Sequence, residues 1–306
     1  MNTISQILMV RPYQFLSNPE TRESNAFQNP STKGITEITA LSLQEFDFMV
    51  QTLRDHKIKV MVFQDPGEVE TPDSIFPNNW ISFHDSGDIF LYPMMAPNRR
   101  LERRFEDISL IIKSQGFKFR RKIDLSYFEL ENKFLEGTGS MVLDRKNKIC
   151  YACLSPRTNT EVVDEFCRES GYRSFIFNAF DENQRPIYHT NVLMCVGDKF
   201  VLACLDSIRD EKQKEGFQEL VQSTKKQLIV ISLNQMNHFA GNMLEVISAD
   251  KVTWLIMSDQ AQKSLSASQI KQLNQYVKIL SIPIYTIEEN GGGSVRCMMA
   301  EIPSEN

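Results

Sequence analysis

One cysteine and one histidine, far apart in the sequence, have the residue types and the settings for covalent catalysis. Cys297 follows a Gly-rich turn whose backbone freedom would allow close approach to a ligand and supply N–H donors, so its thiol is a candidate nucleophile. His189 opens an expected strand and could protonate a leaving amine and then activate water. The alternatives are a buried structural cysteine and a hydrogen-bonded structural histidine. His238 is a weaker candidate because it lies several residues before its strand.

Short acids and amides are the candidates to support this pair. Glu136 precedes another Gly-rich turn, where its carboxylate could hold a histidine nitrogen or accept a hydrogen bond from a substrate, unless it is only a solvated turn residue. Asp73, Asn78 and Asn79 lie beside aromatic residues and suit in-plane hydrogen bonds to a planar, nitrogen-rich group. The alternative for these three is an Asx-type turn.

Five similar turns would have to bring these residues together. Each is a polar or Gly-rich turn that runs into a hydrophobic strand, at residues 77–83, 136–143, 189–195, 239–246 and 291–299. Their spacing of about 50 to 60 residues is typical of repeat units or propeller blades. A doubly wound sheet does not predict five similar turns, whereas five α/β units around a centre would gather them in one place. The sequence therefore predicts a single α/β domain over residues 1–306.

Helical patterns alternate with β-rich runs between these turns. The predicted helices cover residues 44–56, 99–115, 159–170, 209–226 and 266–278. The predicted strands between them include residues 58–63, 227–232 and 282–285. Cys150 and Cys153 lie in a further β-rich run, where they would point to opposite faces, which argues against a zinc or redox pair.

Composition sets limits on partners and location. With 306 residues and 42% hydrophobic composition, the chain can form a large core, and its net charge of -5 gives no attraction for nucleic acid or a membrane surface. No apolar run approaches the roughly 20 residues of a membrane span, and six scattered cysteines suit a reducing compartment, so we expect a cytoplasmic protein. We expect a small amino acid as partner, leave a homodimer open, and see no need for a metal or cofactor.

These motifs together resemble the guanidino-group-modifying superfamily, which includes arginine deiminase, dimethylarginine dimethylaminohydrolase and the amidinotransferases. The resemblance runs from Pro72-Asp-Ser-Ile-Phe76 to Cys297 and is closest to the bacterial branch that hydrolyses citrulline. It implies the pentein fold, a five-bladed α/β propeller of ββαβ repeats around a central active site. It also implies that Cys297 is the nucleophile, His189 the general acid/base and Glu136 the carboxylate beside it.

The same resemblance implies which residues hold the substrate. Arg99 and Arg157 match positions that bind the substrate's α-carboxylate in the dimethylarginine hydrolases, a task that suits a pair of guanidinium forks. Asp73 matches a substrate-binding aspartate of the same relatives.

Departures from the family pattern indicate the substrate. Asn78 and Asn79 stand where guanidinium-binding relatives have acidic residues, and Asn191 stands where arginine deiminases have the aspartate of His-x-Asp. A carboxylate only accepts hydrogen bonds, which suits a cation, whereas an amide also donates. Replacing the acids by amides weakens the binding of a buried guanidinium by on the order of a few kcal/mol. The amides also supply hydrogen-bond donors for a ureido oxygen. We therefore predict that Cys297 attacks L-citrulline, giving ornithine, ammonia and carbon dioxide.

Other functions stay open at the level of sequence. An arginine deiminase, an arginine dihydrolase or a dimethylarginine dimethylaminohydrolase would take a guanidino substrate, and relatives that convert arginine to ornithine also carry an asparagine at such a position. An amidinotransferase must also bind a guanidinium donor, which the asparagines disfavour. A non-catalytic propeller that acts as a binding module is the third alternative, but it has no need for Cys297, His189 and Glu136 at converging turns.

Overall fold

The computed structural model describes residues 5–29 and 31–303, and these residues form five three-stranded sheets. In every sheet one strand pair is antiparallel and the other is parallel, with helix between the parallel strands. This arrangement fits a ββαβ unit repeated five times in a mixed α/β fold, as the sequence predicted. The first unit is split, because β15 from the end of the chain pairs with β1 from its beginning.

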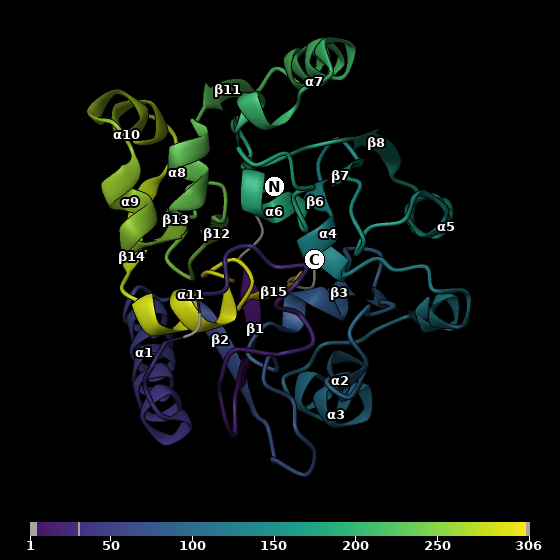
Figure 1. Ribbon diagram of the computed structural model, residues 1–306, viewed down its shortest axis with the longest axis vertical. Coiled ribbons are helices and arrows are strands. Elements are labelled where there is room, and N and C mark those ends of the chain that lie inside the picture. The colour runs from purple at the N-terminus through teal and green to yellow at the C-terminus, as the bar shows by residue number, and fades with distance from the viewer. Residues whose placement is uncertain (1–4, 30, 304–306) are drawn as a thin grey trace.

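The five sheets follow one another along the chain and around the middle of the molecule (Figure 1). The strands, sheet by sheet, are β15 (Ala300–Ile302), β1 (Gln6–Arg11) and β2 (Lys59–Gln64); β3 (Ile81–Phe83), β4 (Asp88–Leu91) and β5 (Arg121–Asp124); β6 (Val142–Asp144), β7 (Ile149–Cys153) and β8 (Arg173–Phe177); β9 (Met194–Val196), β10 (Phe200–Ala203) and β11 (Gln227–Val230); β12 (Leu244–Ile247), β13 (Thr253–Ser258) and β14 (Lys278–Ile282).

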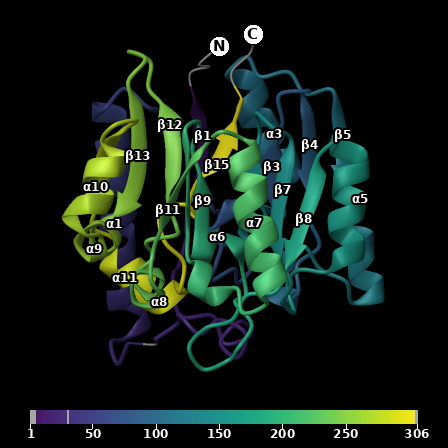
Figure 2. The same ribbon diagram turned by 90° about the horizontal axis from the view of Figure 1, so that it is seen from above.

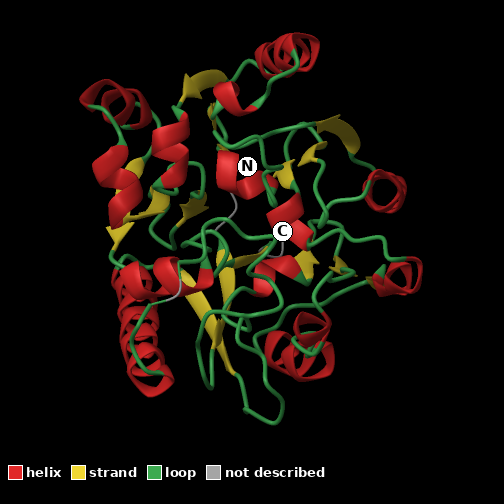
Figure 3. Cartoon of the chain, in the orientation of Figure 1, coloured by secondary structure: helices red, strands yellow, loops and turns green. Residues whose placement is uncertain are grey.

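The longer helices lie at the rim and the strands nearer the middle (Figure 3). The helices between parallel strands are α1 (Ile35–Asp55), α2 (Pro97–Arg100), α3 (Phe105–Ser114), α5 (Thr160–Ser170), η3 (Leu205–Ser207), α7 (Glu211–Ser223), α9 (Asp259–Ser264) and α10 (Ala267–Leu273). The helices in the other connections are η1 (Pro77–Asn79), η2 (Ser126–Glu131), α4 (Gly137–Ser140), α6 (Thr190–Leu193), α8 (Leu233–Asn237) and α11 (Tyr285–Gly291).

Local signals fix α5, whose predicted range is confirmed. The Asn159 side chain accepts a hydrogen bond from a backbone N–H of the first turn, and the helix ends at Gly171, which has a φ of 73°. Val162 and Phe166 lie on its buried face. Capping residues and apolar spacing agree here, so the sequence alone was enough.

Other predicted elements needed correction. Helix α1 begins nine residues before the predicted start of residues 44–56, and the predicted helix over residues 99–115 is two helices, α2 and α3. The predicted strand at residues 282–285 is wrong, because β14 ends at Ile282 and α11 begins at Tyr285. Pro283 lies between them and has no N–H to continue the ladder.

Four of the five predicted turns lead into strands, namely β3, β6, β9 and β12. The fifth, at residues 291–299, does not: the Cys297 N–H donates to the Ser294 carbonyl at 2.9 Å within a turn, and β15 begins only at Ala300. Cys297 therefore lies in a turn and not on a strand.

The polar turns meet at one end of the strands. The Thr138 hydroxyl of α4 donates to the Asn78 carbonyl of η1 at 3.3 Å, and the Thr190 hydroxyl of α6 donates to the Ser140 carbonyl of α4 at 2.5 Å. In Figure 2, α6 and α11 lie at one end of the molecule and the chain termini at the other. The hairpins that follow β6 and β9 lie at the terminal end, because these strands run away from α4 and α6.

The six cysteines are free, and Cys150 and Cys153 lie on β7. They belong to two different hydrophobic clusters, so they point to opposite faces as predicted. No helix in the described part of the chain is both long enough and apolar enough to cross a membrane.

Candidate active site

A small pocket lies where the polar turns meet. Its volume is about 10 Å³, which is the space of roughly one water molecule. The predicted site residues that line it are Asp73, Asn79, Arg99, Arg157, His189 and Cys297. The remaining predicted site residues, Asn78, Glu136 and Asn191, are buried but do not line this pocket.

His189 and Glu136 form a buried pair. The imidazole Nε2 lies 2.8 Å from Glu136 Oε2, and both side chains are almost fully buried. Burial opposes the charge on Glu136, but Arg157, the hydrogen bond with His189 and Arg99 outweigh it and hold the pKa of this carboxyl well below its usual range. Burial, together with Arg157 and Arg99, lowers the pKa of His189 to about 4 despite the carboxylate. The pair is therefore an ionised glutamate and a neutral imidazole at neutral pH.

The tautomer of His189 follows from this contact. Because an ionised carboxylate can only accept, Nε2 carries the hydrogen and Nδ1 is the basic nitrogen. Nδ1 packs against Gly139 of α4, where an added Cβ would lie 2.8 Å from Nδ1 and 2.3 Å from the Asn79 amide nitrogen. Glycine at this position is thus what allows the imidazole and the amide to approach the backbone.

Two amides point their nitrogens at the Cys297 sulfur. Asn191 Nδ2 lies 3.4 Å from Sγ and Asn242 Nδ2 lies 3.3 Å from it, and all three residues are buried. Both donors are placed to stabilise the negative charge that a nucleophilic cysteine sulfur carries.

Asn242 was not predicted as a site residue. Its Nδ2 also donates to the Asn191 carbonyl at 3.1 Å, and its Oδ1 accepts from the Arg296 backbone N–H at 2.9 Å. The available signal was its place in the fourth repeated turn, which matches that of Asn79 in the first. The rival candidate His238 is exposed and contacts the Asn234 carbonyl instead.

Arg99 forms a bidentate ion pair with Glu102, which was not predicted as a site residue. Its Nε and Nη2 donate to the two carboxylate oxygens of Glu102, each at 3.0 Å, and its Nη1 donates to Asn79 Oδ1 at 2.9 Å. Asp73 Oδ2 lies 3.6 Å from Nε. Since a guanidinium can only donate, its contact with Asn79 fixes that amide with the oxygen towards Arg99 and the nitrogen away from it.

This orientation leaves two polar atoms in the pocket wall without partners among the described residues. They are Asn79 Nδ2, a donor, and Asp73 Oδ1, an acceptor. Buried polar atoms normally have a hydrogen-bond partner. These two atoms therefore suit a ligand that accepts one hydrogen bond and donates another.

The segment after β1, the purple chain beside α11 in Figure 1, forms part of the pocket lining and contacts other residues of the site. Arg157 Nη2 donates to the Thr21 carbonyl at 3.1 Å and to the Ser24 hydroxyl at 2.6 Å. Asn18 Nδ2 donates to Asp73 Oδ2 at 2.8 Å, and Asn25 lines the pocket itself. Sequence reasoning missed this segment because its polar residues have no periodic pattern.

Among the described residues, no group of three or more His, Cys, Asp or Glu side chains is arranged to hold a metal ion. The pocket itself contains one cysteine, one histidine and one aspartate, with Arg99 and Arg157 beside them. Its polar groups are therefore suited to covalent chemistry on an organic substrate.

A family model described as N,N dimethylarginine dimethylhydrolase, eukaryotic, matches residues 11–304. No curated protein sequence matches the chain significantly.

Solved structures with a similar fold include the apo form of ArgZ, a cyanobacterial arginine dihydrolase, with a TM-score of 0.75 and 16% identity. That match covers 99% of this chain and only 41% of ArgZ. The N-terminal domain of ArgZ, solved with substrate, has a TM-score of 0.74 and 16% identity, and the match covers 98% of this chain and 99% of the domain. A dimethylarginine dimethylaminohydrolase adduct with S-methyl-L-thiocitrulline has a TM-score of 0.63 and 13% identity, with 98% and 100% covered. At these identities the likeness shows the fold.

Proposed function

Because the chain belongs to the N,N-dimethylarginine dimethylhydrolase family, within the guanidino-group-modifying pentein superfamily, we propose that it is a cysteine-dependent hydrolase of L-citrulline. The observation that carries this proposal is that Asn79 Nδ2, a donor, and Asp73 Oδ1, an acceptor, have no hydrogen-bond partner among the described residues. A ureido group has an oxygen that can accept a hydrogen bond from Asn79 Nδ2 and N–H groups that can donate to Asp73 Oδ1. A guanidinium has only donors and would leave the Asn79 N–H without an acceptor.

In the proposed mechanism, His189 Nδ1 takes the proton of Cys297 and the thiolate attacks the ureido carbon. The bond from that carbon to the ornithine nitrogen breaks, and the imidazolium returns its proton to the departing amine. Water then attacks the remaining S-carbamoyl group with His189 as base. Cys297 is released, and the carbamic acid decomposes to ammonia and carbon dioxide. Glu136 holds the imidazole and stabilises its charge.

Arg99 and Arg157 are proposed to bind the α-carboxylate, Arg99 through N–H groups that Glu102 leaves free and Arg157 through the N–H groups that contact the segment after β1. A pocket of about 10 Å³ cannot hold an amino acid, so the segment over residues 18–28 must move to admit it. Substrate would then replace the contacts that Arg157 makes with Thr21 and Ser24.

The wider assignment is part of the same proposal. The five ββαβ units would close into a pentein propeller, in one domain, with the polar turns around its axis. The free cysteines support a location in the reducing cytoplasm.

A guanidino substrate is the second candidate, and the family description favours it. Hydrolysis of arginine to ornithine would release two ammonia molecules and one carbon dioxide molecule. Hydrolysis of citrulline would release one of each. Ornithine alone does not separate the two reactions, so each substrate must be supplied by itself.

The direct test is a product assay with citrulline as the sole substrate. We expect ornithine and ammonia in equal amounts from the wild type and none from Cys297→Ser, with an S-carbamoyl adduct on Cys297 in quenched wild-type enzyme. Turnover by Cys297→Ser, or an adduct on another cysteine, contradicts the mechanism.

A further inference from the structure

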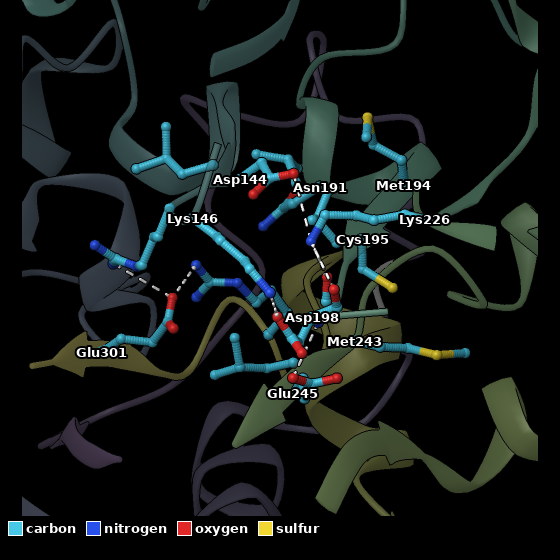
Figure 4. A pocket seen from close by; sticks show the side chains of 17 residues that line it. Asp144, Lys146, Asn191, Met194, Cys195, Asp198, Lys226, Met243, Glu245 and Glu301 are labelled. Atoms are coloured by element: carbon cyan, nitrogen blue, oxygen red, sulfur yellow. Dashed lines mark hydrogen bonds and ion pairs between the residues drawn. The ribbon is translucent and has the colours of Figure 1, made fainter. Parts of the chain in front are cut away.

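A second cavity is lined mainly by residues of β6, β9 and β12 and of the hairpins that follow β6 and β9 (Figure 4). Its volume is about 200 Å³, far more than that of the catalytic pocket. We name it the rear cavity, and its lining includes Arg145, Asn191, Glu245, Arg296 and Glu301. None of the proposed catalytic steps uses this space.

One side of the rear cavity has an excess of positive charge. Arg296 Nη2 lies 3.3 Å from Glu301 Oε2, and Arg145 Nη2 lies 3.5 Å from the same oxygen. Their other recorded hydrogen bonds go to neutral backbone carbonyls, and no second carboxylate of the described chain lies within 4 Å of either guanidinium. Two buried or half-buried cations therefore share one anion.

Another side has an unmatched carboxylate. Glu245 Oε1 accepts the Asp198 backbone N–H at 3.1 Å, but within residues 5–29 and 31–303 no cationic group lies within 4 Å of this side chain. The neighbouring Lys226 ammonium is already used by the Gly197 and Asp198 carbonyls and by the Asp144 carboxylate. Figure 4 shows Glu245 and Glu301 on different sides of the cavity.

The floor of the rear cavity has a free acceptor. Asn191 Oδ1 is buried and has no partner among the described residues, while the nitrogen of the same amide faces the Cys297 sulfur. A buried carbonyl oxygen without a donor is uncommon and indicates a missing partner.

We propose that the rear cavity binds a small zwitterionic amino acid. Its carboxylate would lie against Arg145 and Arg296, where the positive charge is in excess, and its ammonium against Glu245, with Asn191 Oδ1 as a further acceptor. A simple anion or a simple cation would complement only one side of the cavity. The volume suits a molecule of this size. The inference stands on these charges and does not depend on which substrate the active site takes.

Titration calorimetry with L-alanine tests the site in the wild-type protein and in four variants. Glu245→Gln and Arg145→Gln each remove one end of the proposed site. Glu215→Gln is the matched control, because Glu215 is exposed on α7 and outside the cavity. Arg157→Gln reports on any L-alanine bound in the active site.

We expect L-alanine to bind the wild type, Glu215→Gln and Arg157→Gln with equal affinity, and Glu245→Gln and Arg145→Gln at least tenfold more weakly. Acetate and methylammonium, which carry one charge each, should bind at least tenfold more weakly than L-alanine to the wild type. The proposal is overturned if L-alanine does not bind the wild type, or if only Arg157→Gln weakens its binding. It is also overturned if Glu245→Gln and Arg145→Gln both bind L-alanine with wild-type affinity while their folded spectra are unchanged. Glu245→Gln and Arg145→Gln serve as independent variants should one of them fail to fold.

Discussion

Asn242 is expected to set the reactivity of Cys297 as one of two amide donors to its sulfur. In Asn242→Asp, a carboxylate oxygen can still accept the Arg296 N–H, but the donor 3.3 Å from Sγ is lost and a negative charge takes its place. A hydrogen bond to a charged group contributes about 1.5 to 3 kcal/mol, and one pKa unit corresponds to about 1.4 kcal/mol. We therefore expect the Cys297 thiolate to lose at least about 1.4 kcal/mol of stabilisation, so that iodoacetamide alkylates it about tenfold or more slowly at pH 7.

The uncharged variant Asn242→Ala separates the two effects, since it removes the donor without adding charge. Its fall in alkylation rate should be the smaller of the two, and kcat/KM for citrulline at pH 7 should fall about tenfold or more in both variants.

The rate of iodoacetamide alkylation at pH 7 measures this effect. Cys167→Ser is the suitable background, because Cys167 is half-buried and its contact with Cys150 lowers its pKa, whereas burial raises the pKa of Cys153 and Cys195 to about 12. Asn274→Asp, an exposed position after α10, adds the same charge away from the site. If the alkylation rate at pH 7 in Asn242→Asp equals that in Asn274→Asp, the amide donors do not stabilise the thiolate.

Two further predictions concern a close approach and a buried acid. Gly139→Ala should abolish turnover while the protein stays folded, because its Cβ would overlap the Asn79 amide and the His189 ring; wild-type kcat in this variant would refute that geometry. Burial raises the pKa of Glu288, which accepts from the Ser294 hydroxyl, to about 7. Its contribution to stability is therefore complete below pH 4.5 and is lost as pH rises through 7, by up to about 3 kcal/mol. Glu288→Gln should match the wild-type Tm at pH 5 and exceed it by several degrees at pH 8.5, and a difference that does not depend on pH would argue against a neutral acid.

The sequence predicted those features that local patterns determine. The helix after Asn159 carries its own cap, apolar face and terminal glycine, so its bounds were correct. Four of the repeated turns were predicted correctly, because each joins polar residues to an apolar strand. The strand expected around Cys297 was wrong because a Gly-rich turn and a short apolar run do not distinguish a strand from a second turn.

Local sequence patterns could not predict the contacts between repeats. Asn242 contacts Cys297 across 55 positions, and Asn18 contacts Asp73 across a similar separation, so only the fold brings either pair together. Glu102 is three positions from Arg99, a spacing as common on exposed helices as in buried pairs. The rear cavity combines residues of several sheets, and no single motif indicates it.

The ratio of kcat/KM for citrulline to that for arginine, in the wild type and in Asn79→Asp, tests the central claim most directly. The free Asn79 donor predicts that wild-type enzyme prefers citrulline by at least about tenfold, and that Asn79→Asp, which replaces this donor by a charged acceptor, reduces the ratio by a further factor of about ten or more. Equal or better turnover of arginine by the wild type, with a ratio that Asn79→Asp leaves unchanged, would show that the amide does not select a neutral ureido group.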